Sequence, residues 1–259
     1  VQPAAAAPGE TVLVQLQVSE ELDPQSTVQL RSTAGGAVRD LVPLETTGLL
    51  RAYELQGPPL DEGSYDLQLT LSDRAGNRLL GTQRAALLVD GTAPAIAVSP
   101  APMLAPALLG LPGEDGSGGA PQLTLDFALV EANPPPGFDP ADLACTVACP
   151  VVRLDGRALG RVERNAALDD AAAARIGFRY VYVLEVGDWG QVTHAPTPAI
   201  RWQDAAGNEL SQLLELRPTF DLERPSARDC LLSPGQAGAG AEVVFTLTAS
   251  APLRAPPQL

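Results

Sequence analysis

The stretch Leu69–Pro94, LTLSDRAGNRLLGTQRAALLVDGTAP, decides the fold, because most of it returns later in the chain. Its degenerate copy is Ile200–Pro225, IRWQDAAGNELSQLLELRPTFDLERP. In both copies an Asp-x-Ala-Gly-Asn motif is followed, at the same spacing, by a second aspartate and then by a proline. A repeat that keeps its spacing as well as its letters predicts one structural module that is used more than once.

The Asp-x-Ala-Gly-Asn motif predicts a hairpin turn. In Asp73–Asn77 the aspartate suits the first position of a type I turn, where its carboxylate accepts backbone N–H groups, and Gly76 suits the left-handed position. A returning strand is expected over Gln83–Val89, and Pro94 stops the ladder because it has no amide hydrogen. The second copy, Asp204–Asn208, predicts the same turn.

Short segments of alternating apolar and polar residues precede the first turn. In Thr11–Ser19 this alternation predicts a strand with one buried face. Further strands are expected at 27–32, 37–42, 49–55 and 66–71. Their spacing of roughly ten residues is typical of an antiparallel sandwich and not of alternating strands and helices.

The turn, a last strand ending in Val-Asp and the exit Thr-Ala-Pro-x-Ile at 92–96 together resemble the bacterial immunoglobulin-like repeats of surface proteins and adhesins. The resemblance covers Val1–Ile96. It implies an all-β fold of tandem immunoglobulin-like antiparallel β-sandwiches, in which the exit of one module becomes the first strand of the next. Tyr65, placed after an Asp-x-Gly corner, resembles the tyrosine corner of such domains, and an ordinary core tyrosine is the alternative.

The repeat divides the chain into three modules. We expect a first module at 1–94, a second with insertions at 95–226, and the start of a third, incomplete module at 227–259. The third is expected to be completed by residues beyond this sequence or by strands from a neighbour, since an isolated hairpin is marginal in water. In module 2, strands are expected at 123–130, 151–155 and 176–186, with a short helix or a loop at 166–174.

Charge and hydropathy exclude several partner classes. The 259 residues carry a formal net charge of −14, and all 17 basic residues are arginines. An acidic surface argues against nucleic acid and against anionic membranes as partners. No apolar run reaches the roughly 18 residues that a membrane-spanning helix needs, so no membrane insertion is expected.

Two features of module 2 leave alternatives open. Cys145 and Cys149 form a local disulfide, stay as an inert buried pair, or bind zinc, which is the weakest reading because His194 is the only histidine. The apolar half of the insertion Pro100–Gln122 either caps its own sandwich or contacts a neighbouring module or another chain.

The sequence assigns no catalytic, cofactor or metal residue. His194 has no nucleophile in a recognisable setting, no phosphate-binding loop is present, and the acidic pairs Glu20-Glu21 and Asp169-Asp170 are expected on solvated surface. Calcium is the alternative, because hard cations take several oxygens near a turn. The candidate ligands are Glu20, Glu21, Asp23, Asp73 and Asp90 at one module end, and Glu131, Asp204, Asp221 and Glu223 for module 2.

These features favour a non-catalytic structural or adhesive array of a bacterial cell-surface or extracellular protein, with the periplasm as another location. Its modules would serve as spacers or fibre-assembly units, and its partners would be immunoglobulin-like modules of the same or another chain, or other surface proteins. The alternative is a carbohydrate- or protein-binding accessory module of a larger secreted enzyme. That alternative requires surface aromatic residues, and the candidates are Tyr180, Tyr182, Trp189 and Trp202.

Overall fold

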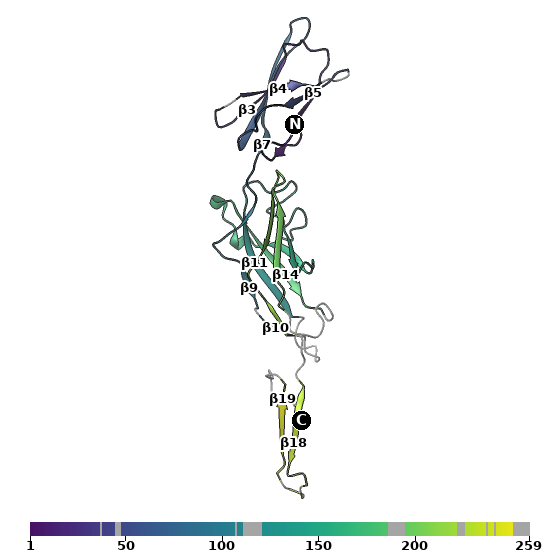
Figure 1. Ribbon diagram of the computed structural model, residues 1–259, viewed down its shortest axis with the longest axis vertical. Helices are drawn as coiled ribbons and strands as arrows, with labels where there is room; N and C mark the ends of the chain where they lie inside the picture. The colour runs from purple at the N-terminus through teal and green to yellow at the C-terminus, as the bar shows by residue number, and fades with distance from the viewer. Residues whose placement is uncertain are drawn as a thin grey trace.

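The computed structural model describes residues 1–36, 38–44, 48–106, 108–110, 121–185, 195–221, 226–236, 238–240 and 242–250. In these ranges the regular structure is β-strand except for two short 3-10 turns. No helix among the described residues is long and apolar enough to cross a membrane. Figure 1 shows two β-rich bodies placed end to end and followed by a hairpin. We refer to 1–94, 95–226 and 227–259 as modules 1, 2 and 3.

Module 1 is one curled sheet in the order β1-β7-β6-β3-β4-β5-β2. Its strands are β1 (Ala5–Ala6), β2 (Leu13–Gln17), β3 (Thr27–Ser32), β4 (Val38–Pro43), β5 (Leu50–Leu55), β6 (Gly63–Ser72) and β7 (Arg78–Val89). All neighbours are antiparallel except β1 and β7. The sheet folds over because β4 changes partner: its first half pairs with β3 and its second half with β5.

Both ends of this sheet contribute to one core. Val14 on β2 and Tyr53 on β5 belong to the same buried cluster as Leu30 on β3 and Leu67 on β6. The hydroxyl of Tyr65, at the start of β6, donates a 2.9 Å hydrogen bond to the backbone carbonyl of Asp61. A tyrosine corner makes this bond back to the upstream backbone, so the structure confirms the corner interpretation of Tyr65.

Module 2 packs two sheets on a second core. Its elements are β8 (Ala95–Ile96), β9 (Met103–Ala105), β10 (Leu108–Gly110), β11 (Gln122–Val130), β12 (Val151–Leu154), β13 (Arg161–Arg164), η1 (Ala166–Leu168), η2 (Ala171–Ala173), β14 (Arg175–Val183), β15 (Pro198–Gln203), β16 (Glu209–Leu213) and β17 (Thr219–Asp221). One sheet runs β13-β14-β11-β8, with β9 also on β11, and the other runs β12-β15-β16. Phe127 and Phe178 of the first sheet share a buried cluster with Ile200 and Trp202 of the second. This facing arrangement has β-sandwich character.

Two open questions about module 2 are settled in the described residues. Cys145 and Cys149 form a disulfide, with their Cα atoms 5.8 Å apart. The segment at 166–174 forms two short 3-10 helices, η1 and η2, in agreement with the short-helix alternative. The Asp170 carboxylate caps η2 by accepting hydrogen bonds from two backbone N–H groups.

Module 3 is a single antiparallel hairpin of β18 (Ala227–Ser233) and β19 (Val244–Ala249). Cross-strand pairing places Cys230 opposite Leu247 and Leu232 opposite Phe245, so these four side chains share one face. Both strands are largely exposed, and Cys230 is a free, exposed cysteine. The described part of module 3 therefore has an apolar face and no second sheet over it.

The two predicted hairpin turns have the same geometry. Gly76 and Gly207 both have φ of +88°, the left-handed conformation that glycine adopts without strain. The first aspartate of each turn accepts 2.8 Å hydrogen bonds from the backbone N–H of Asn77 and of Asn208. The predicted start of the returning strand at Gln83 is wrong, because β7 pairs with β6 from Arg78, directly after the turn.

The Tyr65 hydroxyl bond makes a testable contribution to the stability of module 1. We expect Tyr65→Phe to lower the free energy of unfolding by about 1 kcal/mol, because the part-buried hydrogen bond to the Asp61 carbonyl is lost. Tyr53→Phe is the matched control: Tyr53 is equally buried, but no described residue bonds to its hydroxyl. Urea unfolding of both variants checks this, and equal effects would contradict the corner role.

Candidate functional site

Module 1 meets module 2 at a buried group of three carboxylates. Asp90 directly follows β7, Glu131 directly follows β11, and Asp204 opens the second hairpin turn. One carboxylate oxygen from each residue lies within 4.8 Å of the other two, and all three residues are buried. The group combines residues of both modules, so it forms only when their ends are in contact.

Two asparagine side chains connect the modules across this group. The Asn133 amide donates a 2.7 Å hydrogen bond to Oδ2 of Asp90. The Asn208 amide donates to the backbone carbonyl of Asp90 at 2.9 Å and to Oδ2 of Asp204 at 2.7 Å. Asn208 therefore uses one N–H to close its own turn and the other to hold the exit of module 1.

The hairpin turn of module 2 is held by hydrogen bonds within the turn and to the segment after β11. Oδ1 of Asp204 accepts 2.8 Å hydrogen bonds from the backbone N–H groups of Ala206 and Asn208. The N–H of Ala205 donates to the carbonyl of Asn133, which ties the turn to the segment after β11. These bonds fix the directions in which Asn133 and Asn208 face module 1.

Glu131 has a raised pKa because of its surroundings in this group. Burial raises the pKa of Glu131 above its ordinary value, a hydrogen bond from the Asn133 backbone N–H opposes this, and the Asp204 and Asp90 carboxylates raise the pKa further. Within the described ranges, no arginine forms an ion pair with any of the three carboxylates. Buried like charges need compensation, which a proton or a bound cation supplies.

The donor set matches a hard divalent cation. Calcium takes carboxylate and carbonyl oxygens at roughly 2.4 Å, so two ligands of one ion lie at most about 4.8 Å apart. The spacing of the oxygens of Asp90, Glu131 and Asp204 satisfies that limit. These three residues could therefore hold a calcium ion, with the remaining ligands supplied by water.

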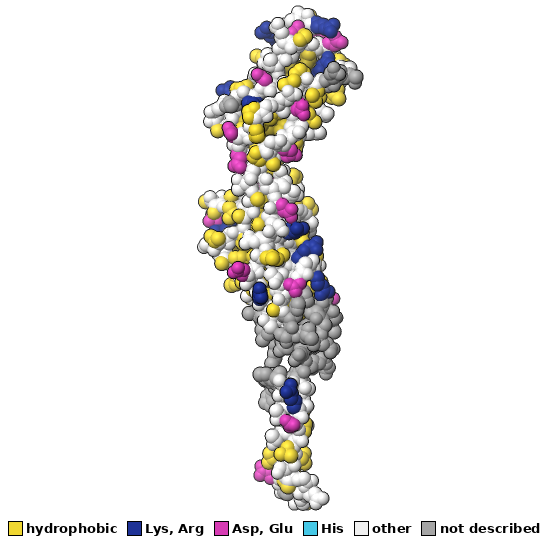
Figure 2. Space-filling view, in the orientation of Figure 1, with side chains coloured by type: hydrophobic (Ala, Val, Ile, Leu, Met, Phe, Trp, Pro, Cys, Tyr) yellow, Lys and Arg dark blue, Asp and Glu magenta, His cyan; other side chains and the backbone are white. Residues whose placement is uncertain are grey.

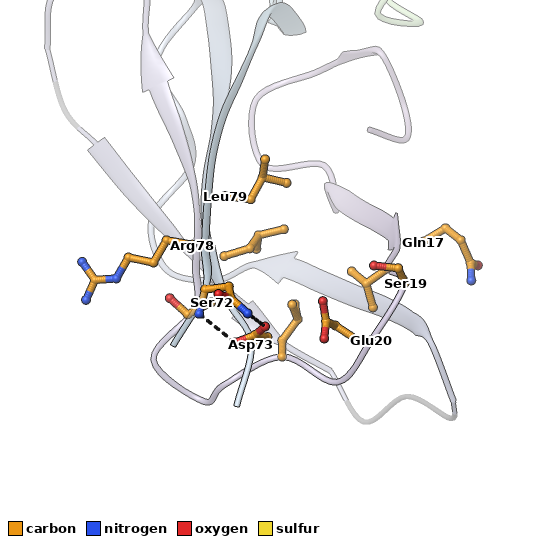
Figure 3. Close-up of a pocket in the computed structure, with 11 residues that line it drawn as sticks. Gln17, Ser19, Glu20, Ser72, Asp73, Arg78 and Leu79 are labelled. Atoms are coloured by element: carbon orange, nitrogen blue, oxygen red, sulfur yellow. Dashed lines mark hydrogen bonds between the residues drawn. The ribbon is translucent and has the colours of Figure 1, made fainter. Parts of the chain in front are cut away.

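The structure regroups the predicted calcium ligands. Grouping Asp90 with Asp73 is wrong, because the two precede and follow β7 and lie at its opposite ends. Asp73 lies instead near Glu20 at the far end of module 1 (Figure 3). Glu131 and Asp204 are brought together as predicted, but their third partner comes from module 1.

The other predicted ligands are not part of the group. Glu21 forms a 2.8 Å ion pair with Arg74 on the surface, and Asp23 accepts the backbone N–H of Gln25 in a local turn. Asp221 ends β17, and Glu223 lies outside the described residues.

The aromatic residues that a carbohydrate-binding surface would need are not exposed where the structure describes them. Tyr180, Tyr182 and Trp202 are buried in the core of module 2. Trp189 lies outside the described residues, as does His194. The accessory-binding alternative gains no support from the three described aromatic residues.

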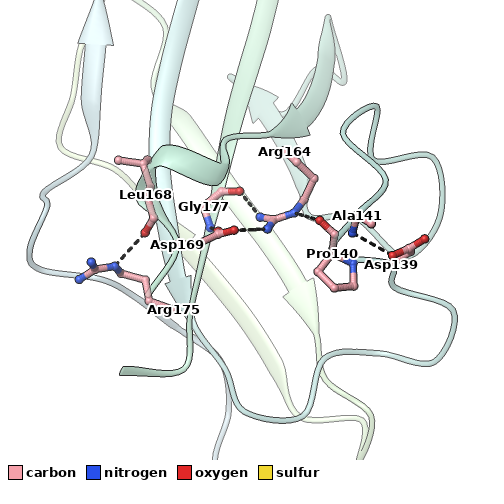
Figure 4. A network of polar contacts seen from close by, with 8 residues as sticks. All are labelled: Asp139, Pro140, Ala141, Arg164, Leu168, Asp169, Arg175 and Gly177. Atoms are coloured by element: carbon pink, nitrogen blue, oxygen red, sulfur yellow. Dashed lines mark hydrogen bonds and ion pairs between the residues drawn. The ribbon is translucent and has the colours of Figure 1, made fainter. Parts of the chain in front are cut away.

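A second polar network in module 2 is structural. The Arg164 side chain is only 1% exposed, yet it bonds both carboxylate oxygens of Asp169 and the carbonyls of Gly177 and Pro140 (Figure 4). Its guanidinium also lies 5.2 Å from the Phe178 ring centroid. Asp169 is exposed, as predicted for a surface acidic pair, but it also anchors the turns after β13 to β14.

The surface carries no dominant charge patch on the face shown in Figure 2. Acidic and basic side chains are scattered along the molecule there, with apolar groups between them. Such a surface offers no continuous cationic stripe to nucleic acid on that face.

No protein-family model matches the chain, and no curated protein matches it. Sequence reasoning missed the two asparagines that bridge the modules, although Asn208 belongs to the repeated motif and so carried a signal.

We expect calcium to stabilise the junction. In the one-site linkage relation, calcium at one hundred times its dissociation constant raises the free energy of unfolding by about 2.7 kcal/mol. Thermal unfolding with millimolar calcium and with EDTA measures this, and Glu131→Gln should reduce the shift because one charged ligand is removed. A melting temperature that neither calcium nor EDTA moves would eliminate the cation.

We expect the stability of the metal-free protein to depend on Glu131 and pH. Because its folded-state pKa is raised, Glu131 contributes stability that is fully present below its unfolded pKa and is lost as pH rises through the folded pKa. In EDTA, the free energy of unfolding of the wild type should therefore fall relative to Glu131→Gln between pH 4 and neutral pH. Urea titrations across that range test this, and parallel pH profiles would refute it.

Proposed function

We propose that this chain is a non-catalytic structural segment of a bacterial cell-surface or extracellular protein. Its immunoglobulin-like β-sandwich modules act as spacers or assembly units, and the joint between modules 1 and 2 sets their relative orientation. The repeat, the acidic composition and the resemblance to surface-protein repeats support this proposal.

The observation that carries the proposal is the polar joint at Asp90. A loose tether between two domains needs no buried contacts, because linkers are normally solvated. Here the exit residue is buried, and its backbone carbonyl and carboxylate each accept a side-chain bond from module 2. Such contacts favour one orientation, which is what a spacer needs to transmit length and direction.

The exit segment supports the same reading beyond Asp90. Residues Ala95 and Ile96 leave the joint directly as strand β8, which pairs with β11 of module 2. The N–H of Ala97 then donates to the carbonyl of Ala128. The connection therefore enters the β13-β14-β11-β8 sheet of module 2 directly, which leaves few free backbone torsions between the modules.

Removing the bridging amide should loosen the joint. We expect Asn208→Ala to broaden the distance distribution between spin labels at Gln83 on β7 and Gln212 on β16, measured in a Cys230→Ser background. Both label positions are exposed. The reason is that the bond to the Asp90 carbonyl is lost together with the bond to Asp204.

Asn77→Ala is the matched control, because Asn77 closes the first turn in the same way but makes no contact between modules. It should leave the distribution narrow. A broad distribution in the unmodified chain would contradict an orienting spacer, and a narrow one in Asn208→Ala would show that this bond does not set the orientation.

A further inference from the structure

The far end of module 1 repeats the construction that receives Asp90 at module 2. Asp73 and Asn77 form the same turn as Asp204 and Asn208, with the asparagine amide on the aspartate at 2.6 Å in the first turn and 2.7 Å in the second. In both modules this turn contacts the segment that follows a buried strand: Leu22, after β2, forms a backbone bridge with Asp73, and Asn133, after β11, accepts the N–H of Ala205.

The acidic residue beside the turn is also repeated. Val12 and Val14 are buried at alternate positions of module 1, as Leu123 and Leu125 are in module 2. Continuing this register places Glu20 at the position of Glu131. Glu20 and Asp73 both line one hollow of about 290 Å³ at this end, together with Val18, Asn77 and Leu79 (Figure 3).

The two ends differ in what covers them. Leu79 is 60% exposed, whereas Leu210, two residues after its own turn asparagine as Leu79 is after Asn77, is 8% exposed. The second amide hydrogen of Asn208 bonds the Asp90 carbonyl, whereas the Asn77 side chain bonds, among the described residues, only to Asp73. The surface that module 1 covers on module 2 is therefore bare on module 1 itself.

A strand edge continues this bare surface. In module 2, β11 carries β14 on one edge and β8 and β9 on the other. In module 1, β2 carries β5 on one edge. On its other edge the described residues supply only a bridge from Gln2 to Leu13, so the edge from Gln15 to Ser19 is unpaired there.

We propose that this end of module 1 binds the exit segment of another immunoglobulin-like module, an extended Val-Asp-x-x-x-Pro peptide like the chain's own Val89–Pro94. The aspartate carbonyl of that segment accepts the free amide hydrogen of Asn77. The residues after its proline add to β2 as an antiparallel strand, by β-augmentation. The inference rests on the proposed array function and names the partner class that extends the array.

The match to the existing joint is incomplete in one respect. Leu22 stands where module 2 has Asn133, so the bond to the carboxylate of the incoming aspartate is missing. Asp73 and Glu20 face that carboxylate as Asp204 and Glu131 face Asp90. The contact is therefore expected to be weaker than the joint between modules 1 and 2 and to respond to calcium in the same direction.

A graft of the chain's own exit tests the proposal. Residues 85–97, AALLVDGTAPAIA, are placed directly before Val1, because Val1-Gln2-Pro3 matches Val98-Ser99-Pro100 in the chain. Hydrogen exchange of the full chain is then compared with and without the graft, in calcium and in EDTA. Slowing of the Gln17 and Ser19 amides, which point away from β5, by about tenfold or more is expected if the edge is paired.

Two controls make the outcome specific. The graft with its aspartate and proline changed to alanine, and the intact graft on Asn77→Ala, should each lose most of the protection. Unchanged exchange in the intact graft would overturn the proposal, and so would concentration-dependent protection in the chain without the graft, because another surface of a second copy would then occupy the edge. These readouts lie within module 1, so they stay informative even if the joint to module 2 proves flexible.

Discussion

The carboxylate of Asp204 accepts three hydrogen bonds from its own turn, and the placement of the modules depends on them. A turn closed only by backbone bonds would leave the asparagine side chain free to rotate. Here one amide hydrogen of Asn208 is held by Asp204, so the other points at a fixed place on the surface. The bond from Asn208 to Asp204 that stabilises the hairpin thus also orients the second N–H of Asn208 toward the backbone of the preceding module.

The all-β fold could largely be predicted because apolar and polar residues alternate along its strands and because its turns need particular residue types. Gly76 and Gly207 occupy left-handed positions that few other residues tolerate, which is why the motif identified both hairpins. The shift of β4 from β3 to β5 gave no comparable signal, since either partner satisfies the same apolar pattern. Pairing across long sequence separations depends on the whole core, and a local pattern does not contain it.

The site was predicted less well for a related reason. Its residues are Asp90 from one module and Glu131 and Asp204 from the next, whereas sequence reasoning grouped Asp90 with Asp73. That grouping ignored the length of β7, whose 12 residues separate the two by about 40 Å at strand rise. The ion pair of Asp169 was not predicted, because it depends on the burial of Arg164, and no local sequence pattern indicates that burial.

The repeat itself explains why one motif serves two purposes. An Asp-x-Ala-Gly-Asn turn uses one amide hydrogen of its asparagine to bond the aspartate, which leaves the second amide hydrogen spare. In module 2 its spare hydrogen binds the exit of module 1, and an acidic residue after the core strand stands beside it. Joining ends through carboxylates costs electrostatic free energy, but it makes the contact responsive to protons and cations. An apolar joint of the same size would lack that response.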